Sequence, residues 1–210
     1  MNERSFKALP LLCILRGVTA PQLDPVLSCI HRAGIVAVEI TMNTQGAPEL
    51  IAQASQRFGT VLWVGAGTVL SAPDARVAVA HGARFIVAPN TNREVAEYCQ
   101  HQSLPYFPGA LTPNEIAYAG QCGATMVKVF PASLFGPPYI KEVRGPLNHI
   151  PLMAVGGVTP ENVGAYFEAG VSAVAIGGST FKREWMESGA WEQISTALSQ
   201  YVDAYHQWTK

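Results

Sequence analysis

Ala124-Thr125-Met126-Val127-Lys128-Val129-Phe130-Pro131 is an apolar, partly β-branched stretch typical of a buried strand, with a single lysine inside it. An unpaired ammonium in such a strand is unfavourable, because it loses its hydration without compensation. Lys128 therefore has two interpretations. It is either a structural charge that pairs with a carboxylate or reaches solvent at a strand end, or an amine whose pKa is lowered by burial and that acts as a nucleophile.

Similar apolar runs recur along the chain and alternate with helical patterns. The predicted strands span residues 11–15, 37–41, 61–65, 85–88, 105–107, 126–130, 151–155 and 173–176. The predicted helices span about 21–33, 46–57, 73–81, 92–101, 113–120, 137–143, 160–169 and 186–207. Uniformly apolar strands that are each followed by a helix indicate a parallel sheet covered by helices. Eight such units predict an α/β fold, a (β/α)₈ TIM barrel.

The boundaries of these units support one domain over residues 1–210. Thr112-Pro113-Asn114-Glu115 forms a capping box, and no linker, charge run or low-complexity segment divides the chain. A doubly wound open sheet is the alternative, but the first strand-to-helix turn, residues 15–19, lacks the G-x-G-x-x-G fingerprint.

Composition excludes several classes of function. The 210 residues carry a net charge of −1 and no basic run, which argues against nucleic acid and anionic membranes as partners. No apolar stretch reaches transmembrane length, and the short run before Arg16 is interpreted as a strand and not as a signal peptide. The four cysteines form no C-x-x-C pair and indicate reduced thiols in a cytoplasmic protein. The five histidines show no metal-binding spacing, so we expect no metal and no cofactor.

Active sites of barrels lie at the carboxyl ends of the strands and in the loops that follow. The polar groups and glycines at those positions are Arg16, Glu39, Asn43, Thr68, Asn90, Lys128, Gly156, Gly157, Gly177, Gly178 and Ser179. Because strand side chains alternate between faces, Val38 and Ile40 facing the helices would place Glu39 in the barrel lumen. The same alternation places Lys128 there.

Glu39 and Lys128 therefore form a structural ion pair in the core, or a lysine nucleophile beside a carboxylic acid that moves protons. The glycine pairs after the last two strands are either ordinary tight turns or a phosphate site made of backbone amides and the Ser179 hydroxyl. Arg16 either binds a substrate carboxylate, helped by Thr68, or pairs with Glu39 at the barrel rim.

Taken together, these motifs resemble the class I 2-keto-3-deoxy-6-phosphogluconate (KDPG) and 4-hydroxy-2-oxoglutarate (KHG) aldolase family. The resemblance covers about residues 9–181 and includes Val38-Glu39-Ile40-Thr41, Gly65-Ala66-Gly67-Thr68, Lys128-Val129-Phe130-Pro131 and Gly156-Gly157-Val158. It implies a (β/α)₈ barrel, commonly trimeric, with a Schiff-base lysine at Lys128 and a proton-shuttling glutamate at Glu39.

One departure bears on the substrate. The gluconate branch of the family usually has arginine at the position of Asn43. The stretches 130–141 and 154–162 look instead like the branch that acts on 2-dehydro-3-deoxy-6-phosphogalactonate. The resemblance then implies cleavage of that sugar acid to pyruvate and glyceraldehyde 3-phosphate, with Arg16 taking over the binding of the carboxylate.

Overall fold

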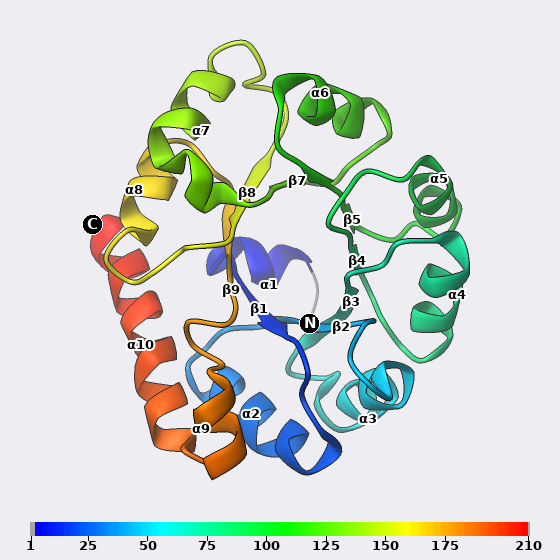
Figure 1. The fold of residues 1–210 in the computed structure, drawn as a ribbon, viewed down its shortest axis with the longest axis vertical. Helices are drawn as coiled ribbons and strands as arrows, with labels where there is room; N and C mark the ends of the chain where they lie inside the picture. The colour runs from blue at the N-terminus through cyan, green and yellow to red at the C-terminus, as the bar shows by residue number, and fades with distance from the viewer. Residues whose placement is uncertain (1–2, 210) are drawn as a thin grey trace.

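The computed structural model describes residues 3–209, which form a ring of parallel strands surrounded by helices (Figure 1). Each strand pairs in parallel with its neighbours, in the order β5-β4-β3-β2-β1-β9-β8-β7-β6. The strands are β1 (Leu11–Leu15), β2 (Ala37–Thr41), β3 (Trp63–Gly67), β4 (Ile86–Val87), β5 (Tyr106–Phe107), β6 (Gly109–Ala110), β7 (Val127–Val129), β8 (Leu152–Val155) and β9 (Ala173–Ile176). The predicted α/β barrel is confirmed.

The ring has nine strands in place of eight because Pro108 divides the fifth one. Proline has no backbone N–H to donate to a ladder, and here it separates β5 from β6. β5 pairs with β4, while β6 pairs with β7. The Pro108 carbonyl still accepts a hydrogen bond of 2.8 Å from the Lys128 amide. The two short strands therefore act as one interrupted strand that closes the barrel.

Helices follow the strands and cover the outside of the ring. They are α2 (Ala20–Arg32), α3 (Ala47–Phe58), α4 (Ala72–Ala80), α5 (Arg93–His101), α6 (Pro113–Gln121), α7 (Gly136–Arg144), α8 (Val163–Glu168), α9 (Arg183–Ser188) and α10 (Trp191–Trp208), with a short 3₁₀ helix, Ala132–Leu134, before α7. The predicted capping box is present at the start of α6, where Thr112 and Glu115 bond each other's backbone amides. Within residues 3–209 no helix is long and apolar enough to cross a membrane.

Several predicted boundaries are wrong. The predicted helix 186–207 is two helices, because Gly189 adopts a left-handed conformation at the end of α9. The strand predicted at 61–65 begins at Trp63, since the amides of Val61 and Leu62 bond back to Phe58 at the end of α3. The helix predicted from residue 160 begins at Val163.

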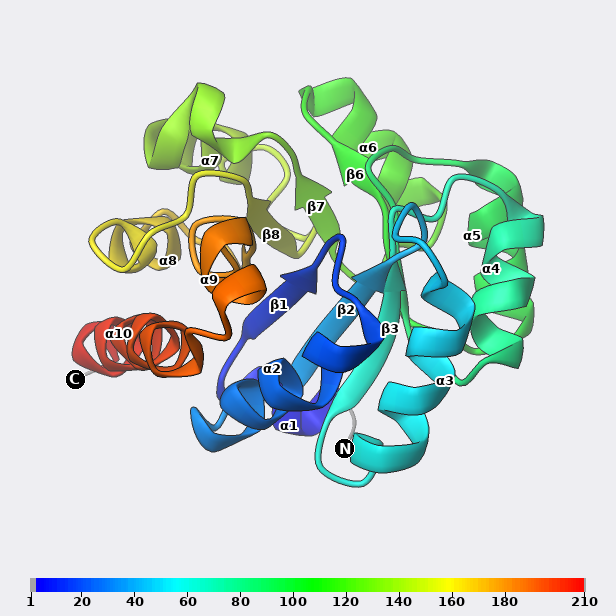
Figure 2. The same cartoon turned by 60° about the horizontal axis from the view of Figure 1, so that its bottom comes forward.

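A helix that the sequence did not predict, α1 (Glu3–Ala8), closes the end of the barrel where the strands begin (Figure 2). Phe6 of α1 is buried with the lumen residues, its ring centroid 5.7 Å from that of Trp63. Phe85 and Phe107 complete this aromatic cluster. One end of the lumen is therefore packed with apolar side chains, and only the carboxyl ends of the strands remain for a polar site.

The core consists of two separate layers. Val38, Ile40, Val127 and Val129 pack outward against the helices, as predicted. Ala37 belongs to the inner layer. Alternation along β2 and β7 therefore directs Glu39 and Lys128 into the barrel.

Candidate active site

Lys128 is the middle residue of β7, and its side chain is only 5% exposed. Its Nζ lies 5.1 Å from the centroid of the Phe130 ring. Burial lowers the pKa of Lys128, and the positive charge of Arg16 lowers it further, while Glu39 acts in the opposite direction. A buried lysine with a lowered pKa carries a larger fraction of neutral, nucleophilic amine.

Glu39 is the middle residue of β2 and is 1% exposed. Space for its carboxylate depends on Gly67 of the neighbouring strand, because a Cβ on Gly67 would lie only 2.0 Å from Glu39 Oε1. Burial raises the pKa of Glu39 and outweighs the opposing effects of Lys128 and Arg16. Among the described residues, Oε2 of this carboxylate has no hydrogen-bond partner. A buried carboxyl group with a raised pKa is suited to giving and taking protons.

The two buried charges are not joined directly. Residues 3–209 contain no ion pair between Glu39 and Lys128, or between Glu39 and Arg16, within 4.0 Å. The structural ion pairs, which the sequence left open as alternatives, are therefore not the arrangement observed. Lys128 still lowers the pKa of Glu39, and Glu39 raises the pKa of Lys128, so the two side chains are close enough to interact electrostatically.

A cavity of about 310 Å³ opens at the carboxyl ends of the strands beside Lys128. It brings together most of the residues that the sequence singled out, namely Arg16, Lys128, Gly156, Gly157, Gly177, Gly178 and Ser179. Phe130, Thr159 and Phe181 also line it, and sequence reasoning gave none of them a role. Glu39 and Thr68 are not among its lining residues. The cavity therefore has the lysine at one wall and glycine-rich loops at another.

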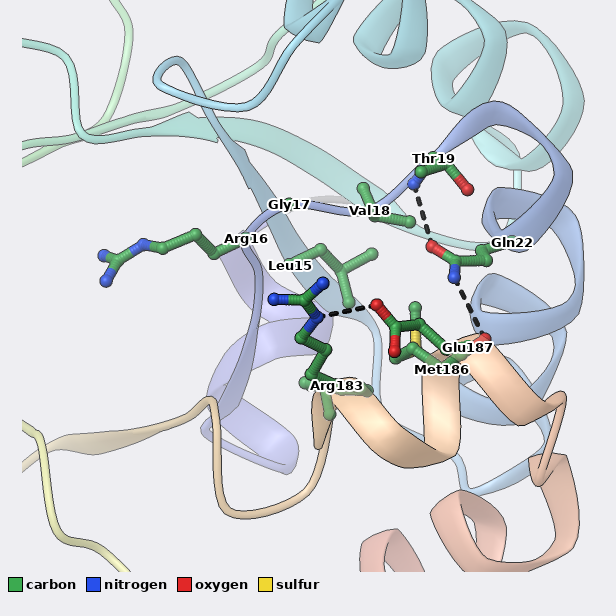
Figure 3. A pocket seen from close by; sticks show the side chains of 10 residues that line it. Leu15, Arg16, Gly17, Val18, Thr19, Gln22, Arg183, Met186 and Glu187 are labelled. Carbon is green, nitrogen blue, oxygen red and sulfur yellow. Dashed lines mark hydrogen bonds and ion pairs between the residues drawn. The ribbon is translucent and has the colours of Figure 1, made fainter.

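A second cavity, of about 410 Å³, adjoins the first and shares Arg16 and Phe181 with it. It lies between the loop after β1 and helix α9 (Figure 3). Arg183 and Glu187 form an ion pair of 2.6 Å there, and the Arg16 side chain extends away from that pair. Arg16 has no partner of this kind within 4.0 Å among the described residues, which leaves its guanidinium group available to an anion.

The loop that carries Arg16 is tied to the loop after β2. Gly17, with a φ of 69°, donates its backbone N–H to Thr44 Oγ1 over 2.9 Å. The Thr44 hydroxyl is 3.0 Å from that of Thr41, at the end of the Glu39 strand. These bonds hold the Arg16 and Glu39 strand ends in register.

The loops after β8 and β9 differ in whether their backbone requires glycine. Gly156 and Gly157 have φ values of 96° and 71°, a region that residues with a Cβ rarely adopt. A Cβ on Gly157 would also approach Ser133 Cβ to 2.4 Å. Around Gly178, in contrast, a Cβ would meet nothing within 4 Å, so steric fit within the chain does not require glycine there. The open space at Gly178 is what a ligand approaching the backbone closely needs.

Comparison with known proteins agrees with this geometry. A family model described as KDPG and KHG aldolase matches residues 3–197. This chain belongs to the KDPG and KHG aldolase family. A 2-dehydro-3-deoxy-6-phosphogalactonate aldolase of Escherichia coli is 32% identical, over 93% of this chain and 96% of the relative. A 2-dehydro-3-deoxy-phosphogluconate aldolase of Haemophilus influenzae is 30% identical, over 95% and 93%.

Solved structures of related aldolases have the same fold as this chain. The structure described as native KDPGal superposes with a TM-score of 0.90 at 32% identity, covering 96% of each chain. A KDPG aldolase from Legionella pneumophila superposes with a TM-score of 0.84 at 25% identity, covering 93% of this chain and 95% of that one. That crystal holds pyruvate captured as a covalent carbinolamine intermediate.

Besides Glu39, three predicted residues of this family member do not line the cavity. Thr68 follows β3 in a left-handed conformation, with a φ of 53°, beside the Gly67 that accommodates Glu39. Asn43 and Asn90 are exposed on their loops. No group of three or more histidine, cysteine, aspartate or glutamate side chains within the described chain is placed to hold a metal ion.

Proposed function

We propose that this protein is a Schiff-base aldolase that cleaves 2-dehydro-3-deoxy-6-phosphogalactonate to pyruvate and glyceraldehyde 3-phosphate. The observation that carries the proposal is the buried Lys128, with its lowered pKa, at the wall of a cavity in a KDPG and KHG aldolase barrel. The relative from Escherichia coli, which bears the name of this activity, supports the choice of substrate.

The chemistry follows from the two buried groups. The neutral amine of Lys128 attacks the C2 ketone, and loss of water from the carbinolamine gives an iminium ion that withdraws electrons. Glu39, directly or through a water, moves protons as the carbinolamine collapses. It also takes the proton of the C4 hydroxyl as the C3–C4 bond breaks, so the aldehyde leaves and an enamine of pyruvate remains. Protonation of the enamine carbon and hydrolysis of the imine release pyruvate and restore the lysine.

The substrate has an acid at one end and a phosphate at the other. Arg16, which lines the cavity near Lys128, binds the carboxylate. Thr68, the second donor in this proposal, lies outside the cavity lining and acts from the loop after β3. Gly156, Gly157, Gly178 and Ser179 hold the phosphate, since backbone amides at glycine-rich turns bind anions closely.

A coupled assay of pyruvate release tests the substrate. Purified protein is given the galactonate substrate and its gluconate epimer, and kcat/KM is expected to favour the galactonate compound. Asn43, at the position where the gluconate branch usually has arginine, favours this outcome. Preference for the gluconate epimer would reassign the substrate and leave the Schiff-base chemistry in place, while no cleavage of either would reject the proposed function.

Arg16→Ala is expected to raise the pyruvate concentration needed for half-maximal borohydride trapping by about 10–100-fold, because charge-assisted bonds to the carboxylate are lost. Arg183→Ala is the matched control, since Arg183 lines the adjoining cavity and is paired with Glu187. Pyruvate lacks a phosphate group, so the assay reports only the carboxylate end. An unchanged half-saturation in Arg16→Ala, or an equal change in both variants, would argue against this role.

Trapping of pyruvate should depend on pH through Lys128. Only the neutral amine attacks, so the rate rises with pH as the ammonium loses its proton. Because burial and Arg16 lower the pKa of Lys128, the midpoint is expected below 10.5, the ordinary value for lysine. Mass spectrometry of the borohydride-reduced protein at a series of pH values gives the midpoint, and a value at or above 10.5 would contradict an activated amine.

The assembly is a further part of the proposal. We infer a homotrimer, which the family resemblance implies. Leu134 and Phe135, 63% and 58% exposed beside the start of α7, supply the kind of apolar surface that subunits bury. The molar mass in solution, from light scattering, decides between trimer and monomer.

The four free cysteines fit a reducing, cytoplasmic compartment.

A further inference from the structure

Tyr201 connects the two loops that form the glycine-rich end of the cavity. It lies on α10, is 1% exposed, and its hydroxyl donates a hydrogen bond of 2.8 Å to the carbonyl of Val158, in the loop after β8. The same hydroxyl is 3.1 Å from Ser179 Oγ, in the loop after β9. We propose that Tyr201 is a positioning residue that fixes the spacing of these loops for a phosphate group. This inference rests on the proposed function.

The hydrogen-bond directions in this bridge are determined by chemistry. A carbonyl oxygen only accepts, so the single phenolic proton of Tyr201 is used on Val158. Ser179 must therefore be the donor in its bond to Tyr201. Burial also raises the pKa of Tyr201, which keeps the phenol protonated and able to donate.

This direction changes how Ser179 acts on a phosphate. Its hydroxyl proton points to Tyr201 and is not available to a dianion, contrary to the role that the sequence suggested for this hydroxyl. The backbone amides of Gly157, Gly178 and Ser179 form no hydrogen bond within residues 3–209. These amides are donors of the kind that bind phosphate, and the Ser179 side chain instead anchors its loop to α10.

Helix α10, which carries Tyr201, is well suited to holding the two loops in place. Tyr201 belongs to an 18-residue helix whose buried face also includes Ile194, Leu198 and Tyr205. A helix that is packed along this length is a rigid support for two loops that contain several glycines. Val158 and Ser179 lie beyond the ends of the neighbouring strands β8 and β9, so strand pairing does not reach them, and the Tyr201 bridge links the two loops.

Tyr201→Phe removes the hydroxyl and keeps the ring, and Tyr205→Phe makes the same change one turn along α10. In Tyr201→Phe, the KM for the phosphorylated substrate is expected to rise about tenfold with kcat within about twofold, as for the loss of one or two buried hydrogen bonds. Half-saturation of borohydride trapping by pyruvate, which has no phosphate, should stay unchanged. Ser179→Ala should add little to Tyr201→Phe, because both break the same bridge.

An unchanged KM in Tyr201→Phe would overturn the inference, as would an equal loss with pyruvate or an equal effect of Tyr205→Phe. Binding of inorganic phosphate, measured by calorimetry on wild type and variants, provides a second test that needs no turnover. If wild type cleaves neither sugar acid, the proposed function fails. Weaker phosphate binding in Tyr201→Phe alone would still support the bridge, and equal binding in all proteins would reject it.

Discussion

Lys128→Ala is expected to abolish cleavage, with kcat falling by roughly 10⁴-fold or more, because the residue that forms the covalent bond is gone. Pyruvate and borohydride should add mass to the wild-type peptide that contains Lys128 and none to the variant. Among the described residues that line the cavity, the other cation is Arg16, whose guanidinium group has hydrogen-bond donors and no free electron pair with which to replace the amine. Peptide mapping by mass spectrometry and the pyruvate-release assay measure both effects.

Two variants separate loss of the nucleophile from loss of the fold. Lys141→Ala removes an exposed lysine from α7 and should keep both activity and the Lys128 adduct. Lys128→Met keeps an unbranched side chain that is one atom shorter and removes the buried charge, so its thermal midpoint should equal or exceed that of wild type. An adduct on another lysine, or cleavage by Lys128→Ala, would refute the assignment of the nucleophile.

The inward direction of Lys128 and Glu39 could be predicted because a strand repeats every two residues. Once Val38, Ile40, Val127 and Val129 were assigned to the helix side, no choice remained for the charged residues between them. The loops after the strands were predictable for a related reason, since parallel strands bring their carboxyl ends to one rim. The position of the cavity therefore followed from local pattern and fold class together.

Other features depend on contacts between distant residues, and no local pattern indicates them. The Tyr201 hydroxyl meets Val158 and Ser179 across 43 and 22 residues, and in the sequence Tyr201 is only one apolar position on a long helix. The six-residue helix α1 is stabilised by Phe6 entering the barrel, which short-range periodicity does not reveal. The separation of Glu39 from Lys128 likewise depends on how the whole barrel packs.

Glu39→Gln is expected to lower kcat by roughly 10²–10⁴-fold, the range for removing a general acid and base. The amide fills the same space against Gly67 and cannot exchange the protons that carbinolamine collapse and C3–C4 cleavage require. Because Lys128 remains, pyruvate should still be trapped by borohydride, although more slowly. Pre-steady-state trapping compared with steady-state turnover shows which of these steps becomes limiting.

Glu39→Gln is expected to slow catalysis without destabilising the protein. Burial raises the pKa of Glu39, so the folded state binds the proton more tightly than the unfolded state, and stability falls as pH rises through the folded pKa. Above that pKa, glutamine removes an ionised and partly unsatisfied carboxylate, so Glu39→Gln should be at least as stable as wild type there. Glu142→Gln, on the exposed side of α7, should change neither property. A large loss of stability with retained activity would show that Glu39 is a structural partner of Lys128, whereas slow turnover by a stable protein shows that its role is proton transfer.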